Sequence, residues 1–332
     1  MRILNYGILA AAAGTLLLLA ACGENSPQQN AESSAPQTEA VTTVTAAETT
    51  TAAETTTTAA YLEQCRAMLS EFPPEDLTEK REGVEYPEFV KLYYDSQTAG
   101  RETGLNVLVP PDYTVEKKYP VLYVLHGSGD TEDWMAGDMV QLSVILNNLV
   151  ADGLAREMIV VSPYIYCSKD MPRCTGLDEQ NFLNFDNFVN DLETDIMPFM
   201  AEHFSIAEGR ENTAVTGFSL GGRESFNVGF SHPEQFGFIG SICPASGVIS
   251  GTGEPHLMER ADFCFRENAP ELLLLSCADQ DGAVGDIPYQ YEEALTENGT
   301  EHLFHEMHGY SHNVESVKAH LYNFLRMIFP QA

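Results

Sequence analysis

A glycine-flanked serine in the run 217–222, Gly-Phe-Ser-Leu-Gly-Gly, sets the strongest limit on how this chain can fold. A β-branched stretch at 213–216 predicts a strand before it, and the pattern of 220–231 predicts a helix after it. A serine in such a strand–turn–helix is typical of a nucleophile elbow, where flanking glycines remove Cβ atoms that would collide with neighbouring backbone. The turn also brings free N–H groups of the helix start beside the serine. We therefore expect Ser219 to be a nucleophile. A glycine-rich helix start is the alternative.

The remaining sequence alternates between short apolar runs and longer amphipathic ones. Such alternation indicates crossover connections and a mostly parallel sheet covered by helices on both faces, an α/β fold. The predicted strands are 105–109, 121–125, 158–162, 213–216, 238–243, 272–276 and 302–307. The predicted helices are 139–152, 182–203, 220–231, 288–297 and 314–329.

A second glycine-rich loop, the His-Gly-Ser-Gly of 126–129, follows the predicted strand 121–125. It resembles the loop that completes an oxyanion hole. The N–H of Ser128 or Gly129 would then join that of Leu220 to hold a developing negative charge. His126 would shape this loop rather than act as a base. A plain strand-to-loop turn is the alternative.

An acid and a base should follow the nucleophile in chain order. The loop after strand 272–276 offers Asp279 and Asp281, and the loop after strand 302–307 offers His308 and His312. Asp279 and His308 lie at the ends of their strands, where the sheet dictates side-chain direction. Asp281 and His312 lie further out, where a loop can turn them toward the serine. Position therefore favours Asp281 and His312 over the other pair.

Four segments, 121–127, 216–222, 225–229 and 322–325, resemble the putative-esterase family. Within it they are similar to family 1 carbohydrate esterases, the feruloyl and acetylxylan esterases of bacteria that degrade plant cell walls. The resemblance implies an α/β-hydrolase fold with a sheet of about eight strands and a triad of Ser219, His312 and Asp281. It further implies an acyl-enzyme, an ester of a plant polysaccharide such as xylan as substrate, and no metal or organic cofactor.

Two further residues are candidates for substrate binding. Arg223, with Glu224, follows the double glycine where small or polar residues are common in feruloyl esterases, and we expect both side chains at the pocket rim. Trp134 is the only tryptophan of the chain and lies just after the second glycine loop. Its ring could stack on a sugar or an aromatic acyl group, or it could anchor the loop by packing.

The N-terminus predicts a targeting segment and a tether. An apolar run at 8–21 ends in Leu-Ala-Ala-Cys-Gly, which resembles a bacterial lipobox with Cys22 as the lipid-modified residue. An ordinary secretory signal is the alternative. Residues 23–60 are rich in Thr, Ala and Glu and predict a disordered tether. We therefore expect a signal peptide at 1–22, an esterase domain at 61–332, and a bacterial cell-surface lipoprotein that meets the membrane through its anchor alone.

Charge and cysteine content limit the partners. The formal net charge is −32, which disfavours nucleic acid as a partner. Six cysteines follow Cys22; Cys167 and Cys174 bracket a short loop and are the favoured disulfide pair, and no spacing suggests zinc. Rival functions are esterases of siderophores or S-acyl thiols, envelope acyltransferases, and a non-catalytic surface binding protein.

Overall fold

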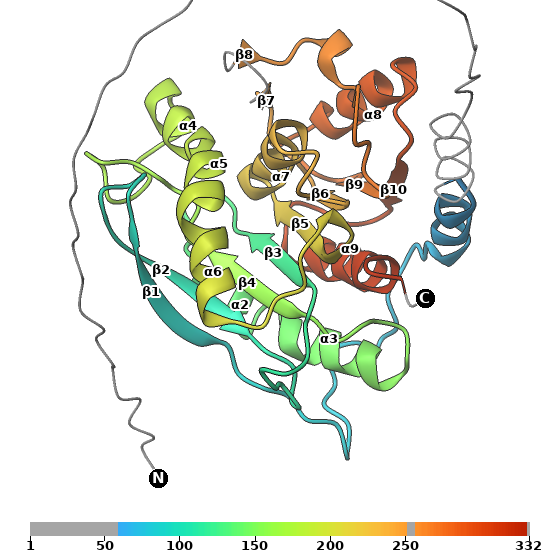
Figure 1. Ribbon diagram of the computed structural model, residues 1–332. Helices are drawn as coiled ribbons and strands as arrows, with labels where there is room; N and C mark the ends of the chain where they lie inside the picture. The colour runs from blue at the N-terminus through green and yellow to red at the C-terminus, as the bar shows by residue number, and fades with distance from the viewer. Residues whose placement is uncertain (1–58, 251–255, 331–332) are drawn as a thin grey trace, which may run out of the picture. The chain divides into compact units, whose positions relative to one another are not determined.

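The computed structural model describes residues 59–250 and 256–330 and is built on one eight-stranded sheet (Figure 1). The strand order is β1-β2-β4-β3-β5-β6-β9-β10. Strand β2 runs antiparallel to both of its neighbours, and all other pairs are parallel. The strands are β1 (Val90–Ser96), β2 (Arg101–Leu108), β3 (Val121–Leu125), β4 (Ile159–Pro163), β5 (Thr213–Phe218), β6 (Phe238–Ile242), β9 (Leu272–Ala278) and β10 (Leu303–Met307). A short ribbon pairs β7 (Ile249–Ser250) with β8 (His256–Leu257).

Helices cover both faces of this sheet. They are α2 (Asp133–Ala136), α3 (Leu142–Ala151), α4 (Glu179–Asp186), α5 (Phe188–Asp191), α6 (Met197–His203), α7 (Leu220–Ser231), α8 (Ile287–Glu297) and α9 (Val314–Met327). A further described helical stretch covers residues 59–68. Figure 1 shows α4, α5 and α6 running as one column, joined through a π-helical turn, Leu192–Ile196. The α/β-hydrolase fold predicted from the sequence is confirmed.

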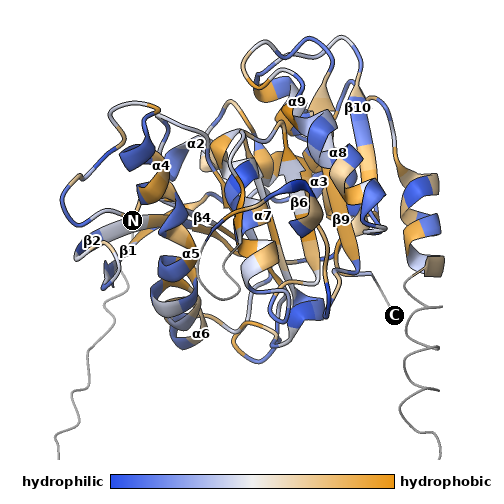
Figure 2. Ribbon diagram, turned by 90° about the horizontal axis from the view of Figure 1, so that it is seen from above, coloured by the Kyte–Doolittle hydropathy of each residue, from blue (hydrophilic) through white to orange (hydrophobic). Residues whose placement is uncertain are grey.

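Strand β3 shows how the sheet divides the core into two layers. Leu122 and Val124 pack in one hydrophobic cluster with residues of α3 and α9. Val121, Tyr123 and Leu125 pack in the other with residues of α4 to α8. Because successive side chains of a strand point to opposite faces, a fully apolar strand is the expected centre of a sheet covered on both sides. Figure 2 shows this as hydrophobic strands such as β9 beside helices of mixed hydropathy.

Two of the differences from the sequence prediction concern elements that contact each other. Strand β1 was not predicted because Val90 and Tyr93 are exposed on the sheet edge, which hides the usual alternation. The expected helix 182–203 is divided into α4, α5, the π-helical turn and α6. At the end of α5 the buried carboxylate of Asp191 accepts hydrogen bonds from the hydroxyls of Tyr94 and Ser96 on β1. The missed edge strand and the interrupted helix therefore contact each other.

The predicted disulfide needs correction. Cys167 and Cys174 are both free, and Cys167 is buried with its thiol toward Asp191. The described helix 59–68 includes two residues assigned to the tether, and the rest of segments 1–22 and 23–60 lies outside the described residues. Of the helices that the structure describes, none has the length and apolar character needed to cross a membrane.

Candidate active site

Ser219 occupies a strained turn between β5 and α7. Its backbone has φ 60° and ψ −117°, a conformation that a non-glycine residue adopts only where its surroundings enforce it. A Cβ on Gly217 would lie 2.3 Å from the carbonyl oxygen of Gly221, and one on Gly221 would lie 2.3 Å from that of Leu125. The Ser219 N–H donates to the carbonyl of Ile242 on β6 at 2.9 Å. The glycines therefore let strand and helix close around the serine, as the sequence predicted.

The structure brings Asp281 and His312 together at the carboxyl end of the sheet. Asp281 follows β9 and His312 follows β10, and the His312 Nδ1 lies 2.7 Å from the Asp281 Oδ2. The other carboxylate oxygen accepts from the N–H groups of Ala283 and Val284, at 2.8 and 3.1 Å. Burial raises the pKa of Asp281, but the hydrogen bonds from His312 and the two N–H groups outweigh it, so the pKa lies below its ordinary value. Because the ionised carboxylate only accepts, we assign the His312 proton to Nδ1, which leaves Nε2 free to accept.

The other two candidates form a separate pair. His308 is 57% exposed and its Nδ1 lies 3.4 Å from the Asp279 Oδ2. Asp279 also accepts from the N–H of Gly309 at 2.7 Å. This pair therefore stabilises the turn after β10, whereas the buried Asp281 and the partly buried His312 lie beside the elbow.

An aromatic stack connects this pair to the elbow. The His312 ring lies 4.4 Å from the ring of Phe218, the residue before Ser219. Phe218 in turn stacks on Trp134 of α2, with ring centroids 5.5 Å apart and planes within 14°. Trp134 therefore has a packing role beside the site, and its half-buried ring leaves stacking on a substrate as a prediction. Sequence reasoning missed Phe218 because the middle position of a Gly-x-Ser elbow carries no signal of its own.

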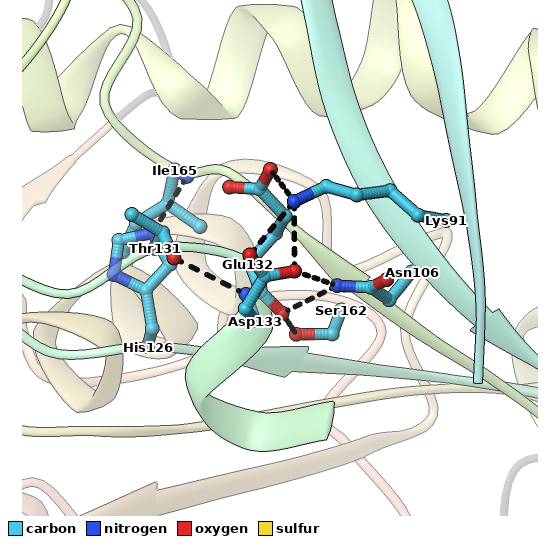
Figure 3. Close-up of polar contacts among 8 residues, drawn as sticks. All are labelled: Lys91, Asn106, His126, Thr131, Glu132, Asp133, Ser162 and Ile165. Atoms are coloured by element: carbon cyan, nitrogen blue, oxygen red, sulfur yellow. Dashed lines mark hydrogen bonds and ion pairs between the residues drawn. The ribbon is translucent and has the colours of Figure 1, made fainter. Parts of the chain in front are cut away.

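The second glycine loop lies beside the serine. A Cβ on Gly127 would lie 3.5 Å from the Cβ of Ser219. His126 is fully buried; its Nε2 accepts from the N–H of Ile165 at 3.2 Å (Figure 3), so its Nδ1 donates to the Gly127 carbonyl at 2.7 Å. Burial lowers the pKa of His126 to about 4, which keeps the ring neutral. These contacts fit a loop-shaping role for His126 and leave Ser128 and Gly129 as candidate oxyanion donors opposite Leu220, the first residue of α7.

Cys243 is a neighbour of the Asp–His pair that the sequence did not single out. It follows β6, is fully buried and has a φ of 44°. Its Sγ and one ligand atom each of Asp281 and His312 lie within 4.8 Å of one another, the one such three-residue group found among the described residues. Burial, with the charge of Asp281 adding to it, raises the pKa of the thiol. A protonated thiol beside an Asp–His hydrogen bond favours the acid–base pair over a metal site at these residues.

The larger of the clefts near the elbow has a volume of about 980 Å³. One of its lining residues, Ser246, follows Ala245, whose N–H donates to the Ser219 carbonyl at 3.1 Å. Its wall includes the exposed apolar residues Leu183 and Leu257. Most of its other lining residues are polar, so a cleft of this size near the elbow can take a ligand that has both polar and apolar parts.

The sequence predicted Arg223 and Glu224 at the rim of the pocket, and this prediction is wrong. Arg223 lines the cleft from a buried position. Its side chain is 2% exposed and that of Glu224 is fully buried. The guanidinium binds Glu224, lies 2.5 Å from an oxygen of Asp186, and donates to the Gly247 carbonyl at 2.8 Å. A buried cation needs such partners, so Arg223 braces the cleft wall from behind.

The sheet topology, the strained serine turn and the Asp–His pair in the last two loops together define an α/β-hydrolase. A family model described as "Putative esterase" matches residues 96–272, more than half of the chain. The chain belongs to this esterase family.

Named relatives and solved structures agree with this assignment. An endo-1,4-beta-xylanase/feruloyl esterase of Xylanibacter ruminicola is 26% identical over 245 residues, which are 69% of this chain and 31% of the relative. Endo-1,4-beta-xylanase Y of Acetivibrio thermocellus is 28% identical over 135 residues, 38% of this chain and 11% of the relative. The chain thus spans about a third or less of these curated relatives. A CE1 ferulic acid esterase of Anaeromyces mucronatus, solved with ferulic acid, is 38% identical with a TM-score of 0.74, and the match covers 79% of this chain and 97% of that one.

Proposed function

We propose that this protein is a serine esterase that removes feruloyl or acetyl groups from plant cell-wall polysaccharide such as xylan. The observation that carries the proposal is the pair of Asp281 and His312, joined at 2.7 Å and packed on Phe218 next to the strained Ser219. Acyl transfer by a serine enzyme requires a nucleophile, a base that takes its proton and an acid that orients the base, and these residues supply all three.

In the proposed mechanism, Ser219 Oγ attacks the ester carbonyl carbon while the free Nε2 of His312 takes its proton. The carbonyl oxygen becomes an oxyanion, held by the N–H of Leu220 and that of Ser128 or Gly129. Asp281 stabilises the imidazolium and holds its tautomer. The carbon–oxygen bond to the alcohol then breaks, and the alcohol leaves with the proton from His312. In the second half of the reaction, His312 takes a proton from water, which attacks the acyl carbon. The bond to Ser219 Oγ then breaks, the serine regains the proton from His312, and the carboxylic acid is released.

The substrate class is supported by the named relatives and by the two kinds of surface near the site. A feruloyl esterase and a ferulic acid esterase are among the relatives, and the match to the latter covers 97% of that protein and 79% of this chain. The large cleft near the elbow has a mostly polar lining, but it also presents the exposed apolar residues Leu183 and Leu257, on which an aromatic acyl group could pack. The acidic chain favours a neutral polysaccharide over an anionic partner. With Cys22 lipid-modified, the enzyme would act at the cell surface.

The serine mechanism is tested by a fluorophosphonate probe and a panel of p-nitrophenyl acetate, methyl ferulate and acetylated xylan. We expect wild type to be labelled and to hydrolyse at least one feruloyl or acetyl ester. Ser219→Ala should lose labelling and activity while its melting temperature stays nearly unchanged, because one hydroxyl contributes little to folding. Labelling that persists in Ser219→Ala would refute the nucleophile, and a labelled wild type that hydrolyses none of the panel would refute the substrate class.

A further inference from the structure

The loop that carries the candidate oxyanion donors is held firmly at its far end. Lys91 Nζ lies 2.8 Å from an oxygen of Glu132 and 2.7 Å from one of Asp133 (Figure 3). The Glu132 carbonyl also accepts from Asn106 at 3.0 Å and from Ser162 at 2.7 Å. Strands β1, β2 and β4 therefore fix this end of the loop, and both of its carboxylates are used in doing so.

Asp130 is the exception in this loop. His126 fixes the near end through Ile165, and Glu132 and Asp133 are paired, but Asp130 has no hydrogen-bond or ion-pair partner among the described residues. Its side chain is half-buried, and burial raises the pKa of its carboxyl. Partial burial of a carboxylate without a partner lowers the stability of the folded state. Such groups are common at binding sites, where a ligand supplies the missing hydrogen bond.

The position of Asp130 connects it to the nucleophile. Its Oδ2 lies 3.5 Å from the point that a Cβ on Gly127 would occupy, and the Cβ of Ser219 lies 3.5 Å from the same point. The Asp130 carboxylate and the Ser219 side chain therefore both lie next to Gly127. The large cleft has different lining residues, among them Ser246, whose neighbour Ala245 donates its N–H to the Ser219 carbonyl.

Asp130 also lines a second cleft of about 370 Å³. Its wall is formed by the glycine loop, β2 and the segment 172–174, and includes Tyr164, Arg101 and the exposed Arg173. One face of the Tyr164 ring stacks on His126. The volume is within the range of about 300–1,000 Å³ that small ligands occupy. Charged and hydroxyl-bearing groups around one aromatic ring suit a polar ligand with many hydroxyls rather than an apolar one.

We propose that this second cleft binds the sugar that bears the ester, with Asp130 accepting a hydrogen bond from one of its hydroxyls. The inference rests on the proposed function and divides the substrate between two clefts. The acyl group would enter the larger cleft and pack on its apolar residues, such as Leu183 and Leu257, and the sugar would lie over the glycine loop. The leaving oxygen would then be released on the side of Asp130.

The test compares an ester with a sugar and an ester without one. The probes are a feruloylated arabinose and methyl ferulate, and the variants are Asp130→Asn and Asp130→Ala. Loss of a hydrogen bond to a charged group should lower the kcat/KM ratio of sugar ester to methyl ester about 10- to 100-fold in Asp130→Ala, mainly through KM. The loss should be smaller in Asp130→Asn, because the amide oxygen can still accept from the hydroxyl. The matched control is Asp138→Asn, an exposed carboxylate of the same segment outside the cleft, which should keep the wild-type ratio.

An equal loss on both esters would overturn the proposal, because Asp130 would then act on the serine or the oxyanion. An unchanged ratio in both variants would overturn it as well. If wild type hydrolyses neither ester, the proposed function fails separately, and the cleft is tested by titrating arabinose and xylo-oligosaccharides against wild type and Asp130→Ala by NMR. Weaker sugar binding by the variant would support the cleft, and equal binding, or no binding by wild type, would refute it.

Discussion

Replacing Asp281 by asparagine should disable the active site without disturbing its shape. In wild type, one carboxylate oxygen accepts from the N–H groups of Ala283 and Val284, and the other accepts from His312. Asparagine has only one oxygen, and the two backbone N–H groups will hold it. The amide NH₂ then faces the imidazole, which must present an unprotonated Nδ1 and carry its proton on Nε2.

This tautomer cannot take the proton of Ser219. The expected loss in kcat is on the order of 10⁴, the value known for the same exchange in a serine protease triad. It corresponds to about 5 kcal/mol of transition-state stabilisation. The assay is steady-state hydrolysis of methyl ferulate and p-nitrophenyl acetate, with circular dichroism and thermal unfolding to show that the variant is folded.

Asp279→Asn is the matched control, because this carboxylate also follows β9 and also faces a histidine, the exposed His308. We expect it to affect mainly stability, with kcat within about twofold of wild type, as for a surface substitution. His312→Ala should lower kcat by several orders of magnitude, whereas His308→Ala should not. A larger kcat loss in the Asp279 or His308 variant, or less than about a tenfold loss in Asp281→Asn, would refute the assignment.

Three further predictions concern the elbow, a buried acid and the anchor. Gly221→Ala should destabilise the fold by roughly 3 kcal/mol or prevent folding, because its Cβ would lie 2.3 Å from the Leu125 carbonyl oxygen; Gly282→Ala, with open space around its Cβ, is the control in thermal unfolding. Burial raises the pKa of Glu224 to about 7, so the folded state binds a proton at this carboxyl more tightly than the unfolded state does. The stability that this proton contributes is fully present below the unfolded pKa of about 4.3 and is lost as pH rises through 7. Glu224→Gln should remove this decline in denaturant unfolding between those pH values, and an unchanged pH profile would contradict the argument. Cys22→Ser should release the protein from membranes into the medium, and continued fractionation with membranes would exclude the lipid anchor.

Elements whose signals are local could be placed from the sequence alone. The predicted strand 121–125 and helix 220–231 have the same bounds in β3 and α7. A run of apolar residues and a glycine-flanked serine carry their meaning within a few positions, because sheet burial and backbone sterics act at that range. The elbow at Ser219 and the loop at 126–129 are therefore recognisable in the printed residues. Chain order also limits the acid and base to two loops.

Contacts between distant segments are established only by the folded chain, even where the sequence favours the residues involved. Asp281 and His312 are paired across two loops, and only the fold shows that Asp279 takes the other histidine. Arg223 is buried because the carboxyl groups of Asp186 and Glu224 bind its guanidinium, contacts that no local sequence pattern indicates. The unpaired state of Asp130 is equally invisible in the sequence, since a carboxylate's partners come from whichever strands lie beside it. The pairing and burial of charge depend on distances in space, and those distances are set by how all the strands and helices pack together.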